Sequence, residues 1–155
     1  MSRDEIKQTV DDFLSLVENG CGSPEENEEK LNFLLDKLAL AQHFATYVFD
    51  DKDYADAPRR DYGELRKLVR AQFPNYGHYN LVKDVTQEIG NTEAIVGDAI
   101  DDIVDIAKDL AEVKWRWENN SPDDALWSLK QDFLFHWNEH LRELQIYLLN
   151  LERAT

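Results

Sequence analysis

The sequence predicts an all-α fold, a bundle of five or six helices that ends in an antiparallel hairpin of two long helices. Apolar residues recur at steps of three and four along most of the chain. Several of these runs begin with a helix start signal. The signal is a Ser or Asp that is followed three residues later by an acid. No segment carries a convincing strand pattern, so we expect no sheet. We expect residues 1–155 to form a single helical domain.

Two helices are predicted in the first third of the chain. Ser2 and Glu5 form a capping box, and the periodic apolar residues that follow predict a helix. It should stop at Gly20 or two residues later, because glycine accepts the left-handed conformation that ends helices. The run Ser-Pro-Glu-Glu at 23–26 starts a second helix, which we expect to reach about Phe49.

The middle of the chain should hold one short helix between two irregular segments. Residues 50–58 contain four aspartates and no apolar period, which predicts an exposed loop. Asp61 and Glu64 open the short helix, and Pro74 ends it. The segment 74–91 is ambiguous between a loop and a short helix, and its alternation is too brief to argue for a strand.

The stretch from Gly97 to His140 contains most of the two long helices. An acidic helix should follow residues 90–93, and a second start signal at Ser121 opens the last helix, which we expect to reach Leu151. Only four residues, Asn-Asn-Ser-Pro, separate the two helices. So short a connection requires the helices to fold back on each other.

Polar side chains line the facing sides of this hairpin. At about 100° per residue, one helix presents a stripe of acids and the other presents two neighbouring histidines. Folding the hairpin at its turn brings Asp105 to the level of His136. It brings Asp101 or Asp102 to the level of His140, again to within about one turn. The stripe consists of Asp98, Asp102, Asp105, Asp109, Glu112 and Arg116.

Three interpretations of these facing groups remain open. We favour a carboxylate–imidazole network, because polar residues in bundle cores more often pair with each other than bind ligands. The second is a metal site, since His136 and His140 with Asp102 and Asp105 form a donor set that Zn or Fe accepts. The third is an acid–base site, although no nucleophile stands beside it.

Residues 136–140 also match H-x-x-E-H, a string found in inverted zinc peptidases. Glu139 turns away from the histidines by about 60–100°, and the short remaining chain offers no further ligand. We therefore interpret the match as accidental. The paired Glu-x-x-His motifs of di-iron bundles are absent, because Phe133 and Trp137 stand at that spacing before the histidines.

The hairpin carries a pattern that resembles the signature of a known family. The pattern is Asp101-Asp102-Ile103-x-Asp105-Ile106-x-x-Asp109-Leu110, then Ala125-x-Trp127, then His136-Trp137-x-x-His140. It is similar to the C-terminal signature of a bacterial family known only as a domain of unknown function. The resemblance implies a small acidic helical protein without an assigned activity. It also implies that one unit is formed by Asp102, Asp105, Asp109, His136, Trp137 and His140.

The charge balance restricts the partners. The chain has 32 acidic and 17 basic residues, and its net charge of −15 repels phosphates and anionic lipid heads. We therefore expect neither nucleic acid nor a membrane as a partner. A start without a signal peptide, no apolar run of membrane-spanning length and a single cysteine, Cys21, predict a cytoplasmic location.

Five positive charges nevertheless gather within twelve residues. The cluster predicts either a binding patch for a small anion or simple neutralisation of the acids in the preceding loop. It consists of Arg59, Arg60, Arg66, Lys67 and Arg70.

The function that the sequence favours is a non-enzymatic one, protein interaction, as in an adaptor, a regulatory or an immunity-like protein. Neither a nucleophile constellation nor a phosphate-binding loop occurs, and the acidity favours a basic protein as partner. Trp115 and Trp117 cannot share a helix face, so we expect one of them to be exposed. The alternative is a metal-binding bundle or metalloenzyme with ligands from His136, His140 and the facing aspartates. The sequence leaves the oligomeric state open.

Overall fold

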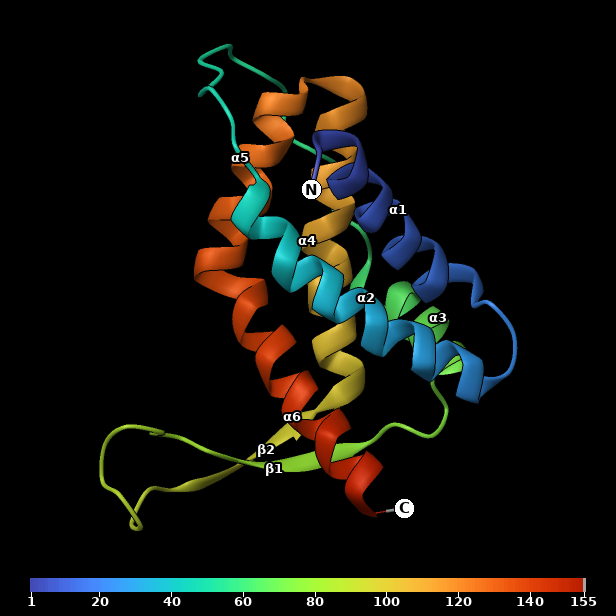
Figure 1. The fold of residues 1–155 in the computed structure, drawn as a ribbon, viewed down its shortest axis with the longest axis vertical. Helices are drawn as coiled ribbons and strands as arrows, with labels where there is room; N and C mark the ends of the chain where they lie inside the picture. The colour runs from blue at the N-terminus through green and yellow to red at the C-terminus, as the bar shows by residue number, and fades with distance from the viewer. Residues whose placement is uncertain (155) are drawn as a thin grey trace.

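The computed structural model describes residues 1–154 and is mostly α-helical, as predicted (Figure 1). One π-helical turn and one two-stranded sheet interrupt the helices. The elements in chain order are α1 (Arg3–Asn19), α2 (Pro24–Phe44), α3 (Tyr62–Gln72), β1 (His78–Val82), β2 (Ala94–Asp98), α4 (Ala99–Asn119), α5 (Pro122–Asp132), η1 (Phe133–Trp137) and α6 (Asn138–Ala154).

The predicted hairpin of long helices is the axis of the molecule. α5, the π turn η1 and α6 continue one another as one rod, which runs antiparallel to α4 (Figure 1). Ser121 caps α5 by accepting the N–H of Asp124 at 3.0 Å. The N–H of Asn120 donates to the carbonyl of Arg116 at 2.8 Å, which closes α4. Because the end of α4 and the start of α5 are so close in sequence, the chain reverses direction in a tight turn.

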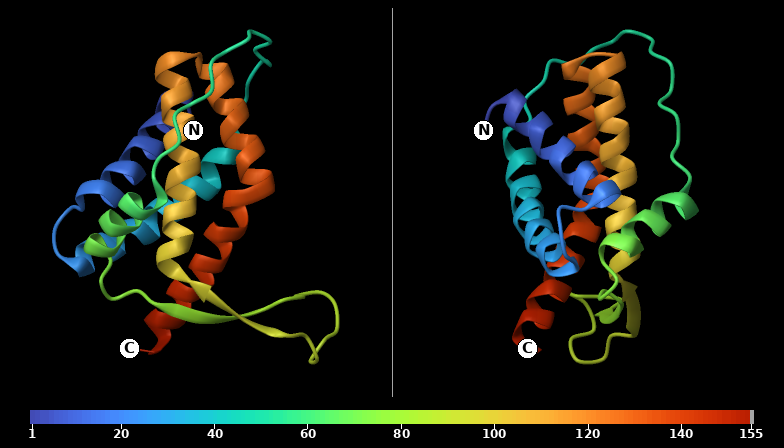
Figure 2. Two further views of the ribbon diagram at one scale, coloured as in Figure 1. Left: turned by 180° about the vertical axis from the view of Figure 1, so that it is seen from behind. Right: turned by 90° about the vertical axis from the view of Figure 1, so that its right-hand side faces the viewer.

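α1 and α2 form a second antiparallel pair that crosses this hairpin obliquely (Figures 1 and 2). Each begins with the capping box that the sequence predicts, at Ser2 and at Ser23. Gly20, with φ of 71°, ends α1. α1 packs on α3 and α4, whereas α2 packs on α6, so both helices bury their apolar sides against the long hairpin.

Residues 45–60, which we call the strap, pass over the turn between α4 and α5 and descend beside α4 to α3 (Figure 2). α2 therefore ends at Phe44 and does not reach Phe49 as predicted. The reason is tertiary contact: the Val48 N–H donates to Asp123 at 3.1 Å, and Phe49 packs edge-on against Trp127. These contacts with α5 draw the chain out of the helix.

The expectation of no sheet is wrong for the segment between α3 and α4. β1 pairs with β2 in an antiparallel register that runs from His78 opposite Asp98 to Val82 opposite Ala94. α4 therefore begins at Ala99, later than predicted, because Asp98 caps it and does not belong to its acidic stripe. The strands project sideways from the bundle (Figure 1), so they bury little apolar surface and carry only a weak alternating pattern.

The hydrophobic core lies where the two helix pairs cross. Trp137 is fully buried in it, stacks edge-on with Phe133, and donates its indole N–H to the Leu129 carbonyl at 3.2 Å. The aromatic segment before β1 closes one end of this core, since Tyr76 is buried against Phe73. Within residues 1–154, no helix combines the length and the apolar character that crossing a bilayer requires.

Candidate functional site

Five ionisable side chains meet between α4 and the rod formed by η1 and α6. His140 bridges two acids: its Nδ1 lies 2.8 Å from Asp102 Oδ1, and its Nε2 lies 3.3 Å from Asp105 Oδ2. His136 Nδ1 lies 2.6 Å from Asp109 Oδ2. The two imidazole rings meet edge to face with centroids 4.9 Å apart. We call these residues the seam: Asp102, Asp105, Asp109, His136 and His140.

The local structure explains which groups pair. The three aspartates recur at steps of three and four on α4 and therefore share one face. The two histidines are four residues apart in the sequence. His136, however, lies in the π turn between α5 and α6, where the helix is not ideal. An ideal helix places His136 at the level of Asp105, whereas the structure pairs it with Asp109, one turn along α4. The structure thus brings the four predicted ligand residues together with Asp109, which the resemblance had placed in the same unit.

Asp102 is the most buried acid of the seam, with 3% of its surface exposed. Both of its oxygens accept hydrogen bonds, one from His140 Nδ1 and the other from the Tyr79 hydroxyl. Tyr79 comes from β1, so the sheet that the sequence did not predict supplies a group that holds the seam. A buried carboxylate with two donors is satisfied and fixed in position.

Gly97 of β2 makes room for the Tyr79 ring. A Cβ at position 97 would lie 2.5 Å from that ring, which also packs against Tyr147 with centroids 5.0 Å apart. We expect Gly97→Ala to displace Tyr79 from Asp102 and to lower the free energy of unfolding by about 1–3 kcal/mol, the usual range for overpacking. Urea denaturation measures the loss.

Gly77→Ala is the matched control, because a Cβ at Gly77 would meet no atom within 4 Å. We expect its free energy of unfolding to stay within about 0.5 kcal/mol of the parent. Equal effects of the two substitutions would show that the Tyr79 ring does not depend on the space at Gly97.

Burial and neighbouring charges shift the pKa values in the seam. The hydrogen bond to Asp102 raises the pKa of His140, and this effect outweighs the burial that lowers it. Burial raises the pKa of Asp105 and of Asp109. Asp132 lies four residues before His136, and burial together with the charge of Asp109 raises its pKa to about 6. Each of these acids, and His140, therefore keeps its proton to a higher pH than an isolated group of the same kind would.

These directions fix the pH dependence of the metal-free protein. The pKa of His140 in the folded state lies above its unfolded value of about 6.5, so its stabilisation is complete below that pH and is lost as the pH rises through the folded pKa. Asp132 acts in the same direction, because its folded pKa is also raised, and its contribution is lost as the pH rises toward about 6. We expect the Tm to fall as the pH rises above about 6, through the folded-state pKa of His140.

Calorimetric melting across this range measures the effect. His140→Gln should flatten the profile, because glutamine cannot take up the proton. A Tm that rises with pH in the parent protein, or an unchanged slope in the variant, would contradict this assignment.

Two groups of side chains offer atoms that converge as metal ligands would. Asp105, His136 and His140 supply one nitrogen or oxygen each, all within 4.8 Å of one another. Asp102, His140 and Glu143 form a second group under the same limit. Glu139 of the H-x-x-E-H string and His43 of α2 belong to neither group.

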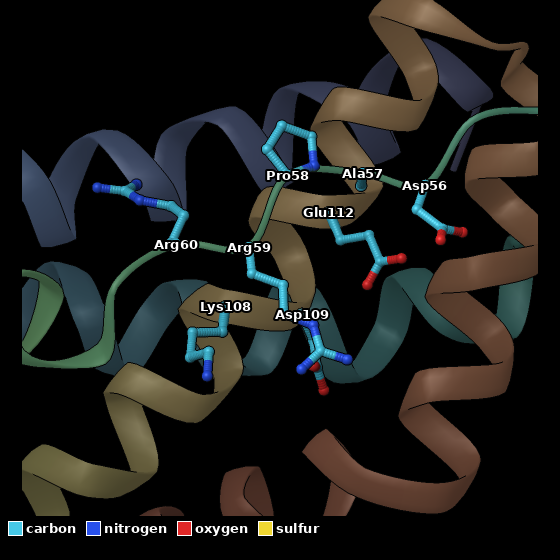
Figure 3. Close-up of a pocket in the computed structure, with 8 residues that line it drawn as sticks. All are labelled: Asp56, Ala57, Pro58, Arg59, Arg60, Lys108, Asp109 and Glu112. Carbon is cyan, nitrogen blue, oxygen red and sulfur yellow. The ribbon is translucent and has the colours of Figure 1, made fainter.

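The five cations of the predicted patch point in different directions. Arg60 pairs with an acid of α1, and Arg66 Nη2 lies 2.8 Å from the carboxylate that caps α4. Lys67 and Arg70 are exposed on α3. Arg59 extends from the strap over α4, where it lines a cavity (Figure 3). Two cations of the five, Arg59 and Arg60, therefore line this cavity together with Asp109 of the seam.

Sequence reasoning missed two groups around the seam, Tyr79 and Asp132, and placed Glu143 beside the histidines without counting it as a candidate ligand. Asp132 and Glu143 had a visible signal, since both stand three or four residues from a seam histidine and so share its helix face. Tyr79 had none, because its approach depends on the sheet.

The fold and the seam define a mostly α-helical protein with an aspartate–histidine cluster between its long helices. The chain belongs to the family described as domain of unknown function (DUF5063), whose model matches residues 3–152. This confirms the resemblance seen in the hairpin and extends it through α1, α2 and α3.

A solved structure shares the fold. The crystal structure of protein BF1032 from Bacteroides fragilis, a structural-genomics target, is similar to this chain with a TM-score of 0.75 and 15% sequence identity. The likeness covers 96% of this chain and 90% of that one. At this identity it concerns the fold alone. A search of curated proteins gives no match.

Proposed function

We propose that the protein binds a divalent transition metal ion, zinc or iron, through Asp105, His136 and His140. One observation carries the proposal: these three residues offer ligand atoms within 4.8 Å of one another from three different helical segments. Two imidazole nitrogens and one carboxylate oxygen are a donor set that suits zinc and ferrous iron.

The remaining acids of the seam support the proposal, because each orients one imidazole. Asp109 binds Nδ1 of His136, and Asp102 binds Nδ1 of His140, which directs both Nε2 atoms away from these acids. Metal-binding histidines commonly hold their second nitrogen in this way, and the hydrogen bond fixes both the tautomer and the ring. Tyr79 in turn fixes Asp102.

The second ligand group is the weaker candidate. It requires His140 to release its hydrogen bond to Asp102 if Nδ1 is the ligand atom, and it contains one imidazole only. The first group also meets solvent, since 47% of the His136 side chain is exposed. Three protein ligands at an accessible position leave room for water or another molecule on the ion.

Thermal melting of protein prepared without an affinity tag tests the proposal. Zinc, and ferrous iron under anaerobic conditions, should raise the Tm, since an ion that binds only the folded state adds about 2.7 kcal/mol at roughly 100 times its Kd. Magnesium is the matched control, because it prefers an octahedron of oxygen ligands. No shift with zinc or iron, or an equal shift with magnesium, would refute the proposal.

A second candidate function is association with a basic protein partner. We infer it from an exposed apolar face on α2, where Phe33, Leu40 and Phe44 lie seven and four residues apart and are 61%, 50% and 45% exposed. The net charge of −15 favours a basic surface over this face. Trp115 and Trp117, by contrast, are both half-buried, so the predicted exposed tryptophan is wrong.

Affinity capture at about 0.15 M salt tests this second function, where surface charges are only partly screened. Phe33→Gln with Phe44→Gln should remove the bound proteins, whereas Val85→Gln, which alters an exposed apolar residue elsewhere, should not. Identical capture by the parent and both variants would exclude the α2 face as the binding surface.

A further inference from the structure

A cavity of about 420 Å³ lies between the strap and α4 (Figure 3). Its wall includes Asp109, the carboxylate that accepts the hydrogen bond of His136. The cavity therefore lies beside the proposed metal site, because Asp109 borders the cavity and also holds one of the metal-binding histidines. This volume falls within the range of small-molecule sites.

Two of the three acids in this cavity wall are hydrogen-bonded to other groups, but neither is fully neutralised, because His136 is charged only when protonated and Arg116 is shared with Asp124. Asp109 is hydrogen-bonded to His136, and Glu112 accepts two N–H groups of Arg116, at 3.2 and 2.9 Å. Asp56, on the strap, is the acid of this wall for which the described residues provide no ion pair.

The cations of this cavity wall differ in whether they form an ion pair. Arg60 turns away from Arg59 and Lys108 (Figure 3) and pairs with Glu18 of α1. Arg59 and Lys108 have no ion pair among residues 1–154; Lys108 only lies over the Tyr62 ring, with Nζ 5.9 Å from its centroid. Within residues 1–154, Arg59 and Lys108 are therefore the cations of this wall that remain available to an anion.

We propose that the cavity binds the phosphoryl group of a small molecule, with Arg59 and Lys108 as its counter-charges and the metal ion of the seam beside it. A guanidinium and an ammonium next to a divalent cation are the groups that bind phosphoryl oxygens most strongly in proteins. The seam repels an anion until a cation enters, so ion and phosphoryl group should each increase the affinity of the other. The coupling, but not the contribution of Arg59 and Lys108, rests on the proposed metal function.

Arg59 is the residue to test, because of the direction in which its side chain extends. Its side chain extends from the strap across α4 toward Asp109 (Figure 3). Arg70, from the same sequence cluster, lies on α3 and does not line the cavity. Arg59→Gln and Arg70→Gln therefore remove the same charge from two positions on the surface. Both variants should keep the Tm of the parent protein, because neither side chain is buried.

Titration calorimetry with inorganic phosphate and with phenyl phosphate, on zinc-loaded and on metal-free protein, tests the proposal. We expect saturable binding that Arg59→Gln weakens about tenfold or more and Arg70→Gln leaves unchanged. Phenyl phosphate should bind at least as tightly as phosphate if the ligand is a phosphorylated molecule. Tighter binding of free phosphate would mean that the ligand is the ion alone and would overturn the small-molecule part of the proposal.

The remaining outcomes separate this inference from the metal function. Benzoate that binds more tightly than phenyl phosphate would overturn the phosphoryl assignment, as would equal effects of the two arginine variants. No phosphate binding to a protein that does bind zinc would remove the inference and leave the metal function intact. Binding that depends on Arg59 but not on zinc, in a protein that zinc does not stabilise, would uphold the cavity and remove the metal function.

Discussion

His140→Ala should abolish the rise of Tm that zinc produces. His140 is the one residue common to both convergent ligand groups of residues 1–154, and it links Asp102 to Asp105 across the seam. Loss of a carboxylate that merely orients a metal-binding histidine costs about 10- to 100-fold in affinity, so loss of the imidazole itself should cost more. The measurement is the Tm with and without zinc.

The same variant should also be less stable without metal. Asp102 is buried and would lose one of its two donors but keep Tyr79, so we expect a loss of about 1–3 kcal/mol. His43→Ala is the control, because His43 is exposed on α2 and should change neither the zinc response nor the stability by more than about 0.5 kcal/mol. A zinc response that survives in His140→Ala would place the ion elsewhere.

Trp137→Ala should destabilise the protein more than any substitution in the seam. The side chain is fully buried, and its removal should cost about 3–5 kcal/mol, as for other large aromatic residues in cores. It would also leave the Leu129 carbonyl without the indole donor and Phe133 without its stacking partner. Urea denaturation followed by circular dichroism measures the change.

Phe135→Ala is the matched control within the same π turn. Phe135 is 79% exposed, so its truncation should change the free energy of unfolding by about 0.5 kcal/mol or less. Comparable losses in the two variants would contradict the assignment of Trp137 to the core. Trp137→Phe keeps a ring but not the N–H and should fall between the two.

The helices could be predicted because their signals are local. Ser2, Ser23, Asp61 and Ser121 each start a helix by side-chain hydrogen bonds that depend on the next three residues only. The short gap between α4 and α5 then determines their antiparallel arrangement. The core followed from the periodicity, since residues such as Leu35 and Ile103 are fully buried.

The features that sequence reasoning missed depend on contacts between distant segments. β1 and β2 pair across a long connection and face solvent, so no periodic pattern identifies them. The π turn changes the level of His136 along α4, which an ideal helix cannot anticipate. The strap brings Arg59 to the cavity although the chain there lacks regular structure. The site could therefore be located on the hairpin, but its supporting groups could not.

The zinc content of the tag-free protein, dialysed against zinc and then against metal-free buffer, tests the central claim most directly. The convergence of Asp105, His136 and His140 predicts about one tightly held zinc ion per chain in the parent protein. It predicts none above buffer in the double variant His136→Ala with His140→Ala. A parent protein without zinc, or a double variant with the same content, would contradict the metal site.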